Sequence, residues 1–138
     1  MFQSNRVRAL DREECLRLLA KVPVGRVVYT RQALPAVLPV NFALDTDHAV
    51  LIRTSADSEL AEVVDGVVVA FEVDEFDAER ESGWSVVVTG HATVVTDPAE
   101  AGRLSEAGPR SWAVGDDCVL VRIEPAMLTG RELGHRPA

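Results

Sequence analysis

Apolar residues near the start of the chain recur at helical spacing. They are Leu10, Cys15, Leu18, Leu19 and Val22. Asp11 stands where its side chain can cap a helix, and Glu14, three residues later, can complete a capping box. Pro23 and Gly25 follow and end the pattern. The pattern therefore predicts a helix over Asp11–Lys21 that packs one apolar face against a core.

Beyond this helix the apolar residues run in short blocks typical of strands. The blocks are Arg26–Thr30, Ala36–Leu44, Ala49–Thr54, Gly66–Val73, Trp84–Val95 and Cys118–Ile123. Asp45–His48 is typical of a turn, and Pro39, which cannot donate a ladder hydrogen bond, marks an edge, a bulge or a break that faces a ligand. Gly66–Val73 is apolar enough for burial on both faces. The acidic run Glu72–Glu81 is expected to be a solvated loop that joins two strands.

Two short helices interrupt the series of strands. One is expected at Ser58–Val64, and Asp97 followed by Pro98 begins the other. The glycine-rich loops that bind dinucleotides (GxGxxG) or nucleoside triphosphates (GxxxxGK[ST]) are absent from the sequence. The order of elements predicts a mainly β (α+β) fold in one domain, residues 1–138: a closed or split β-barrel of about six mostly antiparallel strands with short helices.

Composition narrows the class of protein. The chain holds 14 basic and 22 acidic side chains, a net charge of −8, which disfavours nucleic acid as a partner. No apolar run is long enough to span a bilayer and the N-terminus lacks the apolar core of a secretory signal, so we expect a cytoplasmic protein without a membrane partner. Cys15 and Cys118 form no CxxC pair, which favours two free thiols and no metal site.

The segment VLIRTSADSEL, residues 50–60, carries the clearest chemical signal. A strand runs out through Arg53, Thr54 and Ser55 into a short helix near Ser58, and a guanidinium, hydroxyls and backbone N–H groups together suit a phosphate. The carboxylates of Asp57 and Glu59 oppose this, because they repel a dianion unless they turn away.

Six segments of the chain carry a resemblance to a known family. They are LDREECLRLLAKVPVGRVVY, LPAVLPVNFALD, VLIRTSADSEL, VVVAFEVDEFD, GWSVVVTGHATVV and VRIEPAMLTGREL. Together they resemble the pyridoxamine 5′-phosphate oxidase-like, FMN-binding split-barrel superfamily, in its small actinobacterial and nitroimidazole-resistance-like branch. The match runs from about Leu10 to Leu133. It implies a homodimer with two flavin sites at the subunit interface.

The resemblance also implies roles for individual residues. Pro39, Val40 and Asn41 would lie along the flavin ring. Arg53, Thr54 and Ser55 would hold the phosphate with Ser58, and Trp84 and Ser85 would reach the ring from the partner subunit. Glu59 stands where members that bind FMN well usually carry a lysine, which reverses the sign of one charge contact and weighs against constitutive FMN. A deazaflavin is the alternative cofactor.

Structural roles compete with each of these functional ones. Arg53 can pair with Asp57 or Glu59, and Thr54 and Ser55 can simply cap the helix. Trp84 can anchor a dimer interface without touching a ligand. Asn41 is different, because a buried amide between Val40 and Phe42 needs a partner from a ligand or another backbone.

No Ser-His-Asp or Cys-His arrangement is evident, and no histidine is assigned a catalytic role. We therefore expect the chemistry to belong to a bound flavin or deazaflavin, with hydride transfer to or from a small organic substrate. Arg122 and Arg131 are the candidates for binding an anionic substrate. The alternative is a split-barrel dimer that has lost FMN and binds another small planar ligand.

Overall fold

The computed structural model describes residues 6–106, 108–109 and 118–134. Within them the helices are α1 (Arg12–Leu19), α2 (Glu59–Val64) and α3 (Pro98–Ser105). The strands are β1 (Val7–Ala9), β2 (Val24–Arg31), β3 (Leu34–Asn41), β4 (Ala43–Leu44), β5 (Val50–Ser55), β6 (Val68–Asp77), β7 (Ser82–Val95), β8 (Cys118–Ile123) and β9 (Met127–Leu133). The fold is mainly β, as the sequence predicts.

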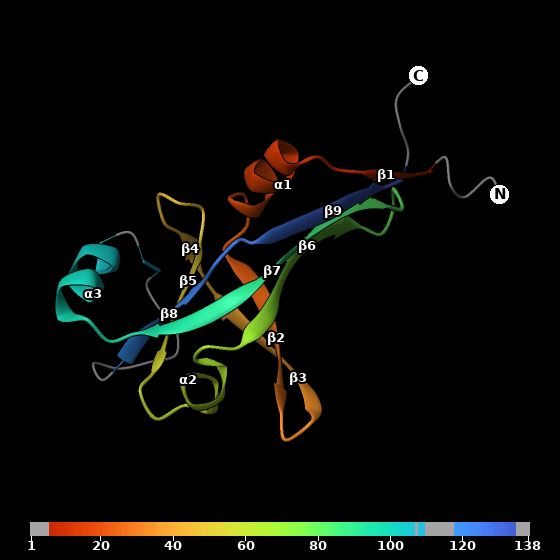
Figure 1. Ribbon diagram of the computed structural model, residues 1–138. Coiled ribbons are helices and arrows are strands. Elements are labelled where there is room, and N and C mark those ends of the chain that lie inside the picture. The colour runs from red at the N-terminus through yellow and green to blue at the C-terminus, as the bar shows by residue number, and fades with distance from the viewer. Residues whose placement is uncertain (1–5, 107, 110–117, 135–138) are drawn as a thin grey trace.

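The strands form one strongly bent antiparallel sheet (Figure 1). Its order is β3-β2-β6-β7-β8-β5-β4, and β9 pairs with β7 on one side and with β1 on the other. The long strand β7 belongs to both halves: its first part pairs with β9 and its last part with β8. Figure 1 shows β6, β7, β9 and β1 running together into an arm beside α1. This is the architecture of a split barrel.

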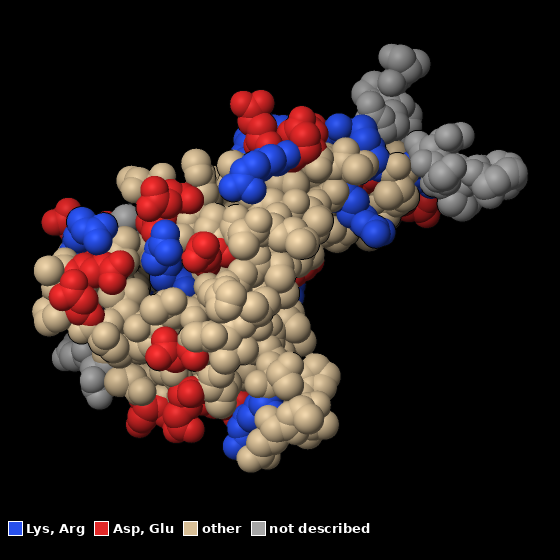
Figure 2. Space-filling view, in the orientation of Figure 1, with Lys and Arg blue, Asp and Glu red and all other residues tan. Residues whose placement is uncertain are grey.

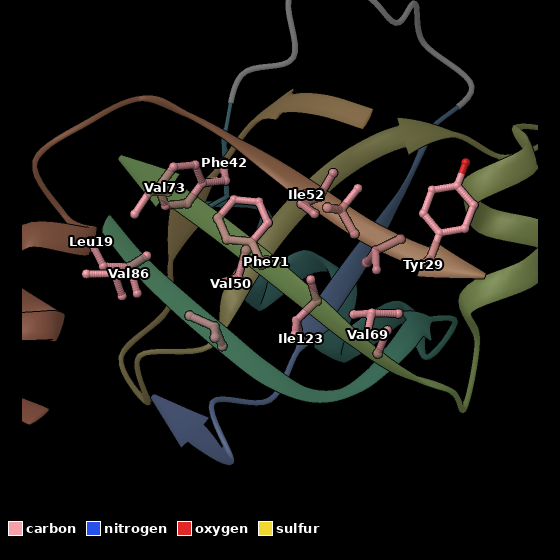
Figure 3. Packing of buried hydrophobic residues seen from close by; sticks show 14 of the residues in the cluster. Leu19, Tyr29, Phe42, Val50, Ile52, Val69, Phe71, Val73, Val86 and Ile123 are labelled. Carbon is pink, nitrogen blue, oxygen red and sulfur yellow. The ribbon is translucent and has the colours of Figure 1, made fainter. Parts of the chain in front are cut away.

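The core lies inside the bent sheet and draws on every second residue of the long strands. Phe71 and Phe42 meet edge to face with ring centroids 4.8 Å apart (Figure 3). Val86 and Val88 belong to the same cluster and are fully buried. The helix α3 covers a second, smaller cluster that contains Leu51, Val95, Leu104 and Leu120. The alternation of β5 therefore sends Val50 and Ile52 into the main core and Leu51 to the α3 side.

Local signals predicted the helices well. Asp11 accepts a hydrogen bond from the backbone N–H of Glu14, and the Glu14 carboxylate accepts one from the N–H of Asp11, so the capping box is present. Asp97 caps α3 with Pro98 at its first position, and Ser58 caps α2. Cys15 packs beneath Gly130 of β9, where an added Cβ would approach its sulfur to 2.7 Å.

Two predictions about β6 are wrong. The segment expected to be buried on both faces alternates, and Val68 is 53% exposed. The acidic run expected to be a loop continues the strand as far as Asp77, because β7 pairs with it along its whole length. The count of about six strands is also too low, since the short β1, the two-residue β4 and the polar β9 carry no strong apolar pattern.

The β2–β3 hairpin projects from the body of the protein. Its turn residues Gln32 and Ala33 both have positive φ, 52° and 66°, which is the primed turn geometry that matches strand twist. Leu34 and Val37 on this hairpin are 68% and 61% exposed, and Figure 2 shows the projection as largely uncharged. Among the described residues, no helix is long and apolar enough to cross a membrane.

Candidate functional site

The residues expected to hold a phosphate lie where β5 ends and α2 begins, but they do not converge. Successive side chains of a strand point to opposite faces, so Arg53 and Ser55 lie on the face that α3 covers and Thr54 lies on the other. Sequence proximity therefore brings the three into one segment, and strand geometry divides them between two faces.

Arg53 is held by the segment that follows α3. Its Nε donates to the carbonyl of Pro109 at 2.9 Å, and one terminal nitrogen donates to the carbonyl of Ser105 at 3.5 Å. The other terminal nitrogen lies 3.8 Å from the sulfur of Cys118, the residue of β8 that pairs with Ser55 of β5. Among the described residues Arg53 has no ion pair with Asp57 or Glu59, so that structural alternative is not what the fold uses.

Thr54 and Ser58 form a hydroxyl pair at the start of α2. The Thr54 hydroxyl donates to Ser58 Oγ at 2.9 Å, and Ser58 Oγ accepts from the backbone N–H of Ala61 at 3.1 Å. The helix-capping role that the sequence analysis weighed for Thr54 and Ser55 falls to Ser58 instead, with Thr54 donating to it. Both side chains remain half-buried polar groups beside one another.

Glu59 is neutralised by its own chain. Its carboxylate accepts a 2.8 Å hydrogen bond from the hydroxyl of Tyr29 and pairs with Arg31 Nε at 3.2 Å. Figure 3 shows Tyr29 reaching from β2 toward α2. Burial, and then the bond to Glu59, raise the pKa of Tyr29, which keeps it a hydrogen-bond donor at neutral pH. This pairing could not be predicted from the sequence, because Arg31 and Glu59 come from different elements.

The residues expected along a flavin ring occupy the last part of β3. Pro39 pairs with Arg26 and Asn41 with Val24, and β3 lies at one end of the sheet order. Of the three readings of Pro39, the structure supports an edge. Asn41 is half-buried and engaged in interactions. In the order of the strands β3 and β5 stand near opposite ends, although the bend of the sheet brings the two strands into contact.

Trp84 and Ser85 point to opposite faces of β7. Trp84 is 8% exposed and belongs to the main core, so its own chain covers the indole. Ser85 faces outward beside Arg131 of β9, its partner in the strand register. Ser85 and Arg131 line a pocket of about 350 Å³ between β7, β9 and β1. The other residues lining it are Val7, Ala9, Val87, Thr129 and Gly130.

Arg122 forms an ion pair with Asp45. Its Nε pairs with Asp45 Oδ2 at 2.9 Å, and a terminal nitrogen lies 3.7 Å from Asp47. Burial by itself raises the pKa of Asp45, but the hydrogen bonds from Arg122 and from the N–H groups of Ala49 and Asp47 outweigh it and hold the pKa below its usual value. Contact with an anionic substrate stays a prediction for Arg122 and would compete with this pair.

A second charged cluster escaped the sequence analysis. Arg26 on β2 places one guanidinium nitrogen 3.2 Å from Glu72 and 3.3 Å from Asp74, both on β6. Burial, and then Asp74, raise the pKa of Glu72 to about 7 against the lowering effect of Arg26. The sequence could have indicated this cluster, because Glu72, Asp74 and Phe76 alternate as residues on one face of a strand do. The prediction of a loop for the acidic run left this alternation unused.

The bent antiparallel sheet with its short inserted helices defines a split-barrel protein. Residues 11–132 match the pyridoxamine 5′-phosphate oxidase family profile, and the chain belongs to that family. An uncharacterised protein of Mycobacterium tuberculosis, Rv0080, is 46% identical over 126 residues, which cover 88% of this chain and 82% of that protein.

Two solved structures show the same fold over nearly the whole chain. The FAD-binding protein of Mycobacterium smegmatis superimposes with a TM-score of 0.81 at 32% identity, covering 94% of this chain and all of that one. A conserved protein of Corynebacterium diphtheriae gives a TM-score of 0.79 at 34% identity, covering 93% and 98%. The resemblance to the split-barrel family is thus confirmed, with actinobacterial relatives.

Proposed function

We propose that this protein is a flavin-dependent oxidoreductase, a homodimer whose flavin sites lie between the two subunits. The observation that carries the proposal is the match over 94% of the chain to a protein that binds FAD, at 32% identity. FMN is the cofactor favoured by the sequence analysis, and the FAD-binding relative makes FAD the second flavin to test.

The residues present are compatible with a flavin phosphate group at the start of α2. Thr54 and Ser58 supply two adjacent hydroxyls there. Glu59, the residue that weighed against an anion, has its charge balanced by Arg31 and its other oxygen bound to Tyr29. Because Arg31 remains 51% exposed, its terminal nitrogens can attract a phosphate from solvent. The expected repulsion between the Glu59 carboxylate and a phosphate is therefore weakened.

A bound flavin would supply hydride transfer to or from a small organic substrate. The chain's own contribution is then to orient the ring and exclude water from it. Pro39, Val40 and Asn41 on β3 are the residues proposed to lie along the ring, and Ser85 is proposed to approach it from the partner subunit.

A second candidate function is a split-barrel dimer that binds a different planar ligand, including a deazaflavin. Arg53 favours it, because the bonds to Pro109 and Ser105 occupy the guanidinium that the family resemblance assigns to a phosphate. Binding a phosphate through Arg53 requires breaking those bonds, whereas a ligand without a phosphate leaves them in place.

The test is a titration of the purified protein with FMN, FAD and a deazaflavin, followed by flavin fluorescence and visible absorption. Micromolar quenching by a flavin, weakened about tenfold or more by Thr54→Ala and by Arg31→Gln, is the expected result. Thr93→Ala, an exposed threonine on β7, is the matched control and should leave affinity unchanged. Bleaching of the bound flavin by a reduced nicotinamide donor then tests the redox role.

Binding of the deazaflavin alone would favour the second candidate. Binding of a flavin that Thr54→Ala and Arg31→Gln leave untouched would support a flavoprotein but remove the phosphate from the start of α2. If the protein binds none of the three ligands, the proposal is overturned.

A further inference from the structure

The face of the sheet that points away from α1 is large and carries its residues in rows. We call it the outer face. It comprises Val68, Ala70, Glu72, Asp74 and Phe76 of β6, Gly83, Ser85, Val87, Thr89 and His91 of β7, and Met127, Thr129, Arg131 and Leu133 of β9. Opposite, on the inner face, Cys15 of α1 and Leu10, just before the helix, lie against Gly130. Figure 2 shows that the surface of the protein is hollowed between the β2–β3 hairpin and the arm of β6, β7 and β9.

Charge on the outer face is unbalanced from side to side. On β6 the carboxylates of Glu72 and Asp74 share the single guanidinium of Arg26. On β9 Arg131 is exposed, and it makes no ion pair with any residue that the structure describes. One side of β7 thus has a carboxylate in excess, and the other side has a cation in excess.

The strand register places these two excess charges symmetrically. Asp74 pairs with Ser85 across β6 and β7, and Ser85 pairs with Arg131 across β7 and β9. Asp74 and Arg131 therefore stand in the same row, each one strand away from Ser85. A twofold axis that runs along β7 and parallel to the sheet would bring the β9 of one copy over the β6 of another, with rows aligned.

We propose that a second copy of this chain packs on the outer face about such an axis, with Arg131 of each copy bound to Asp74 of the other. The proposal rests on the homodimer of the proposed function and specifies how that dimer is held. In the dimer each of these cations then has one carboxylate. Arg26 keeps Glu72 of its own chain, and Asp74 turns to the partner's Arg131. A contact of this kind is isologous, so it occurs twice.

The apolar rows fit the same axis. Phe76, Gly83 and Leu133 share the next row, and Phe76 and Leu133 are 57% and 38% exposed. The axis sets Leu133 of one copy over Phe76 of the other, and in a further row it sets Met127, 59% exposed, over Ala70. Large apolar side chains that water surrounds in one chain are covered in the pair.

The spacing of packed sheets suits an arginine opposite an aspartate. Two sheets stack about 10 Å apart, a gap that a long guanidinium side chain and a short carboxylate can bridge together. Ser85, the small residue of β7 that stands between Asp74 and Arg131 in their row, leaves room for the two longer side chains. Arg131, expected from the sequence to bind substrate, is in this proposal a residue of the subunit contact.

The experiment is a charge swap read by sedimentation and by the dissociation constant of the dimer. Arg131→Glu and Asp74→Arg should each weaken self-association roughly 100-fold or more, because each places like charges together twice. Mixing the two variants should restore a heterodimer, since both contacts are then attractive. The double variant in one chain should restore the homodimer in the same way.

Controls separate a loss of contact from a loss of fold. Arg103→Glu, an exposed arginine of α3 away from the outer face, should dimerise like the unmodified chain. Far-ultraviolet circular dichroism of each variant checks folding, and Arg131→Gln offers a milder change that should weaken association without repulsion.

Each failure has its own meaning. If the unmodified protein sediments as a monomer at micromolar concentration, the homodimer and this contact both fall. If the unmodified protein is a dimer but the single swaps leave its dissociation constant unchanged, or folded swaps show no recovery on mixing, the dimer stands and the Arg131–Asp74 contact is overturned.

Discussion

Replacing Arg122 with alanine separates a structural role from a substrate-binding role. The Asp45 side chain is only 5% exposed, and Arg122 Nε gives it a charge-assisted hydrogen bond at 2.9 Å. After Arg122→Ala the carboxylate keeps its two backbone donors, the N–H groups of Ala49 and Asp47, but loses its counter-ion. Removing one partner of a buried pair costs about 3–5 kcal/mol, and the partial exposure of Arg122 places the expected loss near 2–4 kcal/mol.

Urea unfolding at neutral pH measures this loss. The matched control is Arg103→Ala, which breaks an exposed 4.0 Å pair with Glu100 and should change the free energy of unfolding by less than about 0.5 kcal/mol. The double variant Asp45→Ala with Arg122→Ala should lose less than the sum of the two single variants, because the groups interact directly.

The pH dependence has a definite sign. The pKa of Asp45 is lowered in the folded protein, so the ion pair stabilises the fold above the ordinary aspartate pKa, near 4, and this contribution disappears as the pH falls through the folded value. The difference between the unmodified protein and Arg122→Ala should therefore shrink in acid. Unchanged stability of Arg122→Ala together with reduced turnover would refute this reasoning and favour the substrate role.

Three further predictions concern separate parts of the fold. Glu72→Gln should raise the free energy of unfolding at pH 8 by about 1–3 kcal/mol and have much less effect at pH 5. The reason is that a carboxyl whose pKa is raised in the folded protein destabilises the fold only as it ionises. Equal effects at both pH values would contradict this. Gly90→Ala should cost several kcal/mol in thermal or urea unfolding, since its Cβ would meet the backbone carbonyl of Glu124, whereas Gly102→Ala in α3 has open space and should gain about 0.5–1 kcal/mol. Asp11→Ala should cost about 1 kcal/mol, and a cost near zero would mean that the cap does not stabilise α1.

The family resemblance identified the fold, and local chemistry predicted many of its elements. A cap followed by periodic apolar residues needs only neighbours in the sequence, which is why Asp11 and Asp97 were assigned correctly. The strand Cys118–Ile123 was also predicted with the observed bounds, because four apolar residues in a row, Cys118–Val121, are followed by Ile123 after a single polar position. Elements without such a run were missed: Met127–Leu133 alternates through polar residues and becomes a strand by pairing with β7.

The candidate site was predictable only as a set of residues, and its geometry was not. Strand alternation turns Arg53 toward the segment after α3 and Thr54 toward the other face, although the two are adjacent in the chain. Glu59 meets Tyr29 and Arg31 because α2 packs beside β2. Whether a carboxylate repels a ligand depends on which cation lies within a few ångströms of it, and that distance is a property of packing.

The sequence by itself determined the family, the mainly β fold, the caps of the helices and the residue types offered to a ligand. These follow from periodicity and short-range hydrogen bonding, which act over a few residues. The tertiary structure decided which charges are already paired, as in Arg122 with Asp45, and which stay open, as in Arg131. Ion pairs act through space at a few ångströms, so they are decided only when the sheet has brought distant strands together.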